Sequence, residues 1–175
     1  KAPIEWSVAG AYSIANVQVA DTAQAPNLSD LAAEILARAP EKFALAGLSM
    51  GGYIAFEILR QAPDRVLRLA LLDTSARPDT QERKRHRQSL ITMAKSGRFQ
   101  GVTPRMLPWL IAQRHLDNEA MTGRIYAMAQ RVGSDGFINQ ETAVKDRPDS
   151  RPLLPDIKAP TIVICGRDDK LTPPT

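Results

Sequence analysis

The chain has 175 residues, 43% hydrophobic and 24% charged, which is the composition of an ordinary globular protein with one sizeable core. Much of its formal charge of +4 sits in residues 83–87, which no aromatic residues interleave, so a solvated helix face explains the run and a nucleic-acid partner is not expected. No apolar run approaches the roughly 20 residues that span a membrane, and a single cysteine fits a reducing, cytoplasmic location.

The first 75 residues alternate between apolar stretches and helical patterns. Residues 17–21 alternate as a strand does, and Asn27 then caps a helix with an apolar stripe. Phe43–Leu48 and Val66–Leu72 are apolar stretches of strand length, and a helical repeat separates them. Residues 6–12 are ambiguous. Strands that alternate with helices predict an α/β fold with a doubly wound, mostly parallel sheet.

The second half opens with a long helical segment. From residue 79 to about residue 145, apolar residues recur at helical spacing and no strand pattern interrupts them. Such an insert between two strands is typical of a cap, or lid. A proline-rich connector then leads to a strand at residues 161–165. The expected organisation is a core (1–75), a helical cap (76–152), and a returning strand with its following loop (153–175).

The whole chain is organised around residues 47–52, with the sequence GLSMGG, where an apolar strand turns abruptly into a helix. This is a Gly-x-Ser-x-Gly pattern, in which a strained turn projects the Ser49 hydroxyl above the sheet. Side chains at Gly47 and Gly51 are expected to collide with neighbouring backbone. The turn also leaves the Met50 N–H at a helix N-terminus, able to donate to a developing oxyanion. The alternative is a glycine-rich turn that merely contains a serine, and the flanking strand and helix argue against it.

On residues 43–75 and 160–169, the chain resembles the α/β-hydrolase family with a helical lid. The resemblance implies an enzyme that cleaves a carboxylic ester or similar small acyl substrate through an acyl-enzyme on Ser49, with no metal or organic cofactor. Acyltransferases, carbon–carbon bond hydrolases and cofactor-free haloperoxidases share the elbow, and the sequence does not separate them. A non-catalytic ligand-binding or receptor module of the same fold is the alternative from another class.

The resemblance also implies an acid for the catalytic triad. The family's Gly-x-x-Asp after this strand matches Asp169 and not Asp168. Asp73, after the preceding strand, is the alternative, because some relatives place the acid there. The family's catalytic histidine follows a further strand beyond the acid. The chain's two histidines, His86 and His115, fall inside the cap and are expected to be dispensable for proton transfer.

Two further expectations concern the edges of this resemblance. The catalytic histidine, the second oxyanion donor and the family's strand between residues 17–21 and Phe43–Leu48 are expected outside this sequence. A gap of roughly 10 Å, two strand spacings, should therefore separate those two strands. In the cap, Met106 and Trp109 are candidates for a flexible acyl pocket, although methionine stripes at helical spacing more often belong to a core.

Overall fold

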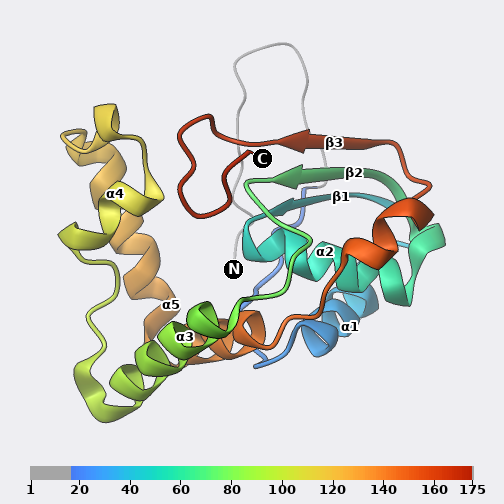
Figure 1. Cartoon of the computed structure of the whole chain (residues 1–175). Helices are drawn as coiled ribbons and strands as arrows, with labels where there is room; N and C mark the ends of the chain where they lie inside the picture. Colours follow the sequence, from blue (N-terminus) through green and yellow to red (C-terminus); the bar gives the residue numbers. More distant parts are fainter. Residues whose placement is uncertain (1–16, 175) are drawn as a thin grey trace.

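A three-stranded parallel sheet forms the centre of the structure, a computed structural model that describes residues 17–174 (Figure 1). The ambiguous residues 6–12 lie outside the described part. β1 (Phe43–Leu48) pairs with β2 (Val66–Leu72), and β2 pairs with β3 (Thr161–Ile164). The ranges predicted for the first two strands are confirmed, and β3 ends one residue earlier than predicted. Since the strands are parallel, their carboxyl ends share one edge of the sheet.

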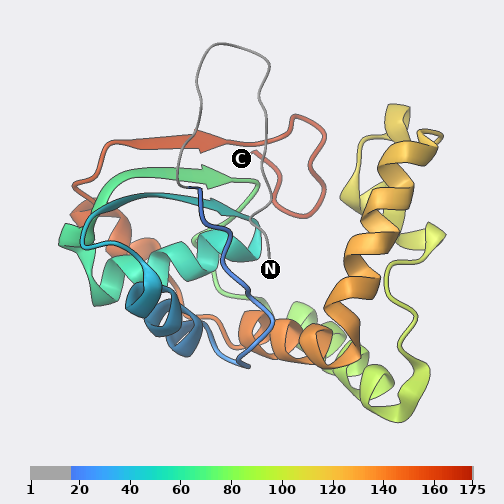
Figure 2. The same ribbon diagram turned by 180° about the vertical axis from the view of Figure 1, so that it is seen from behind.

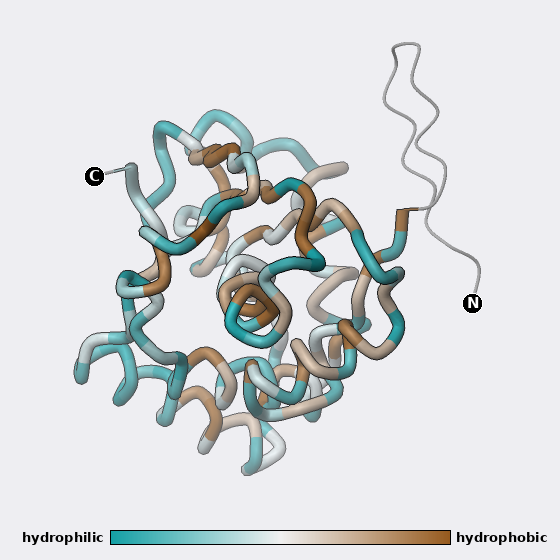
Figure 3. Tube along the Cα trace, turned by 90° about the vertical axis from the view of Figure 1, so that its right-hand side faces the viewer, coloured by the Kyte–Doolittle hydropathy of each residue, from teal (hydrophilic) through white to brown (hydrophobic). Residues whose placement is uncertain are grey.

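Two helices build the core beneath the sheet. Asn27 caps α1 (Leu28–Arg38), as predicted, by accepting a hydrogen bond from the Asp30 N–H at 2.7 Å. α2 (Met50–Gln61) is buried almost all round from Gly52 to Leu59, because it packs against the sheet on one side and α1 on the other (Figures 1 and 2). Figure 3 shows hydrophilic residues on most outer turns and hydrophobic residues further in. The α/β class with a mostly parallel sheet is therefore confirmed.

Residues 17–21 form no strand, and that prediction is wrong. Val17 and Val19 are 42% and 68% exposed, and the segment pairs with none of the three described strands. An alternating pattern becomes a strand only where a neighbour satisfies its N–H and C=O groups. Because residues 17–21 form no strand, there is no pair of strands for the expected gap to separate. β1 is an edge of the described sheet.

Residues 81–145 are helical, as predicted, and stand beyond the carboxyl edge of the sheet (Figures 1 and 2). The elements are α3 (Gln81–Met93), a π-helical turn η2 (Ala94–Arg98), η3 (Pro104–Met106), α4 (Leu107–Leu110), η4 (Gln113–His115) and α5 (Glu119–Lys145). α5 bends at Gly133, whose φ is 69°. Its first half stands near α4 and its second half packs along α3.

Short 3₁₀ helices complete the connections: η1 (Pro63–Arg65) precedes β2, and η5 (Arg151–Asp156) leads from the cap to β3. None of the helices within residues 17–174 is both long and apolar enough to cross a bilayer.

Candidate active site

Ser49 occupies a sharp turn between β1 and α2. β1 ends at Leu48 and α2 begins at Met50, so Ser49 is the single linking residue. Its φ of 51° and ψ of −112° lie in a region that residues with a side chain rarely adopt. Such a backbone costs on the order of 1–3 kcal/mol and persists only where its surroundings hold it. Because the residue is also exposed, the turn is the first candidate for a reactive site.

The glycines around Ser49 do not share one role. A Cβ on Gly47 would lie 2.4 Å from the Gly51 carbonyl oxygen, so the predicted collision at Gly47 is confirmed. A Cβ on Gly51 would meet no described atom within 4 Å, so the predicted collision there is wrong. The second crowded position is Gly52, where a Cβ would lie 2.3 Å from Thr74 Oγ1. The physical reason is orientation: Gly51 is half exposed on α2, whereas Gly52 is buried against the loop after β2.

The backbone N–H groups at the elbow have different uses. The Ser49 N–H donates to the Leu72 carbonyl oxygen at 2.9 Å, so it is committed to the sheet. Met50 is the first residue of α2, and N–H groups of a first helical turn have no acceptor within the helix. They also lie at the positive end of the helix dipole. This position suits an oxyanion donor, and the role of Met50 stays a prediction.

Asp169 is held firmly in the loop that follows β3. Its Oδ1 accepts the N–H groups of Leu171 at 2.8 Å and Thr172 at 3.0 Å, and its Oδ2 accepts the Thr172 hydroxyl at 2.6 Å. Partial burial opposes ionisation, but these hydrogen bonds outweigh it and lower the pKa of Asp169. The carboxylate is therefore charged and oriented at neutral pH, as a group that orients a histidine must be.

The adjacent Asp168 faces the cap instead. Its Oδ2 lies 2.9 Å from Arg114 Nη1, in an ion pair whose side chains are 55% and 69% exposed. Lys170 of the same loop donates to the Pro108 carbonyl oxygen at 2.9 Å. These contacts connect the loop to the cap, whereas Asp169 is bonded within the loop itself. The two neighbouring aspartates therefore have separate surroundings.

Asp73, the alternative acid, shares a corner of the structure with Asp169 and Cys165. One oxygen or sulfur atom from each of the three lies within 4.8 Å of the others. Burial and the two carboxylates raise the pKa of the Cys165 thiol, which favours its protonated form. The carboxylates already accept backbone N–H groups. The cluster therefore holds loops together by hydrogen bonds that the protein itself supplies.

The remaining predicted residues lie in the cap. Met106 is half-buried at the end of η3, and Trp109 on α4 is 58% exposed, with its ring centroid 6.0 Å from Lys170 Nζ. His86 is exposed on α3, and His115 is half-buried in η4. Both histidines belong to cap helices and precede β3 and Asp169 in the chain. The substrate-binding role of Met106 and Trp109 stays a prediction.

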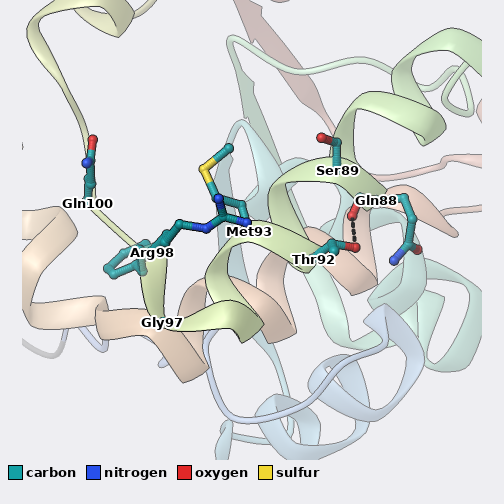
Figure 4. Close-up of a pocket in the computed structure, with 8 residues that line it drawn as sticks. Gln88, Ser89, Thr92, Met93, Gly97, Arg98 and Gln100 are labelled. Carbon is teal, nitrogen blue, oxygen red and sulfur yellow. Dashed lines mark hydrogen bonds between the residues drawn. The ribbon is translucent and has the colours of Figure 1, made fainter.

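Two hollows lie in the cap, and Figure 4 shows the first of them. One of about 710 Å³ is bounded by the end of α3 and the π-helical turn, and a second of about 540 Å³ lies between that turn and α5. The first is lined by Gln88, Ser89, Thr92, Met93, Gly97, Arg98, Phe99 and Gln100. Neither hollow includes Ser49 or Asp169, so neither forms part of the candidate active site.

Sequence reasoning missed the residues that support the site. The Thr74 hydroxyl donates to the Ser49 carbonyl oxygen at 2.8 Å. A lone threonine after a strand gives no signal of such a contact. The sequence feature that reflects this contact is the second glycine after the elbow, Gly52, because its missing side chain makes room for Thr74.

A serine in a strained strand–helix turn, an oriented aspartate after another parallel strand and a helical insertion together define an α/β-hydrolase domain. Residues 11–163 match the family described as thioesterase domain. The chain belongs to that family.

Two esterases and a lactonase are among the known proteins similar to this chain. This chain is 26% identical over 134 residues to the pimeloyl-(acyl-carrier protein) methyl ester esterase of Neisseria meningitidis serogroup C. The match covers 74% of this chain and 52% of that protein. A thermophilic esterase from Thermogutta terrifontis superposes with a TM-score of 0.76 at 31% identity, covering 85% of this chain and 57% of that one.

An enol-lactonase from Burkholderia xenovorans LB400 has the same fold, with a TM-score of 0.70 at 24% identity over 81% of this chain and 55% of that one. The chain therefore spans about half the length of these proteins.

Proposed function

We propose that the natural full-length protein is a serine hydrolase that cleaves a carboxylic ester or similar acyl substrate through an acyl-enzyme on Ser49. The observation that carries the proposal is the Ser49 backbone, with φ at 51° and the side chain exposed. Ligand binding alone needs no such strained turn. The family and the esterases to which the chain is similar support the same class of reaction.

In this mechanism the Ser49 hydroxyl oxygen attacks the acyl carbon, and its proton passes to a histidine supplied from outside residues 1–175. Asp169 orients that histidine and stabilises its charged form. The Met50 N–H donates to the oxygen that becomes negative in the tetrahedral intermediate. The histidine then gives its proton to the leaving alcohol or thiol. Water attacks the acyl-enzyme by the same route, which releases the acid and restores Ser49.

The cap completes the proposal. Residues 76–152 form the lid over the site, and Met106 and Trp109 line the acyl pocket. The support is the place of Trp109, which is 58% exposed and lies beside Lys170 of the loop that carries Asp169. The reaction uses no cofactor, and its partner is a small acyl or ester molecule. The single cysteine supports a cytoplasmic location.

A fluorophosphonate probe tests the assignment in the natural full-length protein. The wild type should be labelled at Ser49, and Ser49→Ala should lose both labelling and turnover of a p-nitrophenyl ester, by several powers of ten. Ser89→Ala is the matched control, since Ser89 is exposed on the cap. Turnover that survives in Ser49→Ala would place the nucleophile elsewhere. A wild type that is neither labelled nor active would favour the non-catalytic module.

A further inference from the structure

Two consecutive residues, Asp73 and Thr74, lie between the elbow and the loop that carries Asp169. They follow β2, which is the central strand of the described sheet, between β1 and β3. Among the described residues with a side chain, Ser49 and Asp73 are the ones that have a positive φ, 51° and 41°. Strained backbone of this kind gathers where the surrounding structure fixes a functional arrangement. The shared positive φ therefore makes Asp73 a second residue, beside Ser49, whose backbone conformation its surroundings hold.

Thr74 supports the elbow directly. Its hydroxyl donates to the Ser49 carbonyl oxygen at 2.8 Å, and the Gly52 N–H donates to the same oxygen at 2.9 Å. The Thr74 side chain also fills the space beside Gly52, where a Cβ would lie 2.3 Å from Oγ1. A hydrogen bond and a close contact thus hold a Ser49 backbone that is otherwise unfavourable.

Asp73 supports the other side of the site. Its N–H donates to the Ile164 carbonyl oxygen at 2.9 Å, and its Oδ1 accepts the Gly166 N–H at 2.7 Å. The Gly166 carbonyl oxygen in turn accepts the Asp169 N–H at 3.1 Å. The base of the loop that carries Asp169 is therefore bonded to Asp73.

The role of Asp73 as an acceptor does not require its charge. An asparagine Oδ1 accepts the same N–H, and asparagine tolerates the left-handed backbone as well as aspartate does. A triad acid is different, because the negative charge itself stabilises the protonated histidine. Asp73→Asn therefore distinguishes a role as hydrogen-bond acceptor, which it preserves, from a role as triad acid, which it removes.

We propose that Asp73 and Thr74 are positioning residues that form a bracket between the nucleophile and the acid: Thr74 holds the backbone of Ser49, and Asp73 holds the loop of Asp169. The proposal rests on the proposed serine hydrolase function. Its consequence is mechanical, since a misplacement of about 1 Å between reacting groups costs on the order of 100-fold in rate. The bracket fixes the spacing between the turn that carries the nucleophile and the loop that carries the acid.

Thr74 is tested with two substitutions of opposite effect. Thr74→Val keeps the shape and removes the hydroxyl, and Thr74→Ser keeps the hydroxyl. Thr74→Val should lower kcat by about 10-fold to 100-fold with little change in KM, and should slow fluorophosphonate labelling of Ser49 in proportion. Thr74→Ser should restore most of both. Equal activity of the valine variant and the wild type, or equal losses in both variants, would overturn this half of the bracket.

Asp73 is tested with Asp73→Asn and Asp73→Ala. The asparagine variant should retain turnover and the pH–rate profile, because Oδ1 still accepts the Gly166 N–H. The alanine variant should lose about 10-fold to 100-fold in kcat, with faster hydrogen exchange at the Gly166 amide. A crippled asparagine variant, with a mild Asp169→Asn, would make Asp73 the triad acid and overturn the proposal. An alanine variant with wild-type turnover and exchange would overturn it as well.

These outcomes stay separate from the proposed function. Thermal unfolding of each variant gives the folded fraction to which rates are normalised, and the asparagine and serine variants keep the comparison usable if the alanine or valine variant does not fold. Failure of the proposed function would appear in the wild type, as absent labelling and turnover. Failure of the bracket would appear in the variants of an active enzyme. The Gly166 exchange rate tests the Asp73 contact even without activity.

Discussion

Asp79 and Arg147 form an ion pair that is almost completely removed from solvent. Arg147 Nη1 lies 2.7 Å from Asp79 Oδ1, and the Arg147 and Asp79 side chains are 3% and 0% exposed. The contact is an ion pair rather than a well-directed hydrogen bond. Asp79 lies just before the first cap helix and Arg147 just after the last, so the pair joins the two ends of the insertion. The Arg147 guanidinium also lies 4.4 Å from the ring centroid of Tyr53 on α2, which connects the cap to the core.

Removal of the Asp79 carboxylate should therefore destabilise the protein strongly. Arg87 contacts the same carboxylate at 2.6 Å, so Asp79→Ala leaves two cations with a lost partner. The free energy of unfolding should fall by about 3–5 kcal/mol, as for other broken buried ion pairs. Asp168→Ala is the control, because its pair with Arg114 is exposed and should contribute less than about 1 kcal/mol. Urea denaturation measures both, and similar losses in the two variants would contradict the role of burial.

The crowding of the elbow predicts opposite effects at two glycines. Gly47→Ala forces a Cβ against the Gly51 carbonyl oxygen and should lower the free energy of unfolding by about 1–3 kcal/mol or more. Gly51→Ala meets no described atom and lies within α2, so it should raise stability by about 0.5–1 kcal/mol through helix propensity. Thermal unfolding distinguishes the two. A loss at Gly51 comparable to that at Gly47 would show that both positions need glycine.

Local signals in the sequence predicted the centre of the fold well. Phe43–Leu48 and Val66–Leu72 are apolar stretches of strand length, and both form strands of the parallel sheet, although most residues of β1 are not buried. The segment at 17–21 alternates as a strand does, but it pairs with none of the described strands, and no local pattern reports whether a neighbour exists. Pairing partners are a property of the assembled chain.

The candidate site was predictable only where its residues lie close together in sequence. The elbow around Ser49 is a local motif, so its strained backbone could be foreseen. The support from Thr74, 25 residues away, could not. The ion pair between Asp79 and Arg147 spans the whole insertion and shows no spacing rule. Contacts between side chains distant in sequence depend on how the whole chain packs, and no short stretch of sequence reports them.

His86 and His115 are predicted to be dispensable for proton transfer. Both lie in cap helices, before β3 and Asp169 in the chain, whereas the family's histidine is expected after the acid. His86→Gln and His115→Gln should each leave the shape of the pH–rate profile unchanged, although KM changes if the cap shifts. The profile of the natural full-length protein on a soluble ester provides the measurement. Loss of the limb that reports the base in either variant would assign the base to that histidine.

Asp169→Asn should keep the fold and reduce turnover by up to about 10⁴-fold, because the orienting charge is lost. Asp168→Asn is the matched control, one residue away and paired with Arg114 instead. Initial rates with the same ester compare the two variants. Equal losses would show that the loop as a whole, and not the Asp169 carboxylate, is needed.

The lowered pKa of Asp169 also predicts a pH dependence of stability. Hydrogen bonds from Thr172 and Leu171 overcome the opposing effect of burial and hold the folded pKa below the ordinary value of 3.8. A carboxyl group with a lowered folded pKa binds fewer protons when folded, so its contribution to stability is fully present above the unfolded pKa. That contribution disappears as the pH falls through the folded pKa. The difference in unfolding free energy between the wild type and Asp169→Asn should therefore shrink as the pH falls below the ordinary value of 3.8 and through the lower folded pKa. Urea denaturation across this range measures it, and a constant difference would mean that the carboxyl group has no lowered pKa.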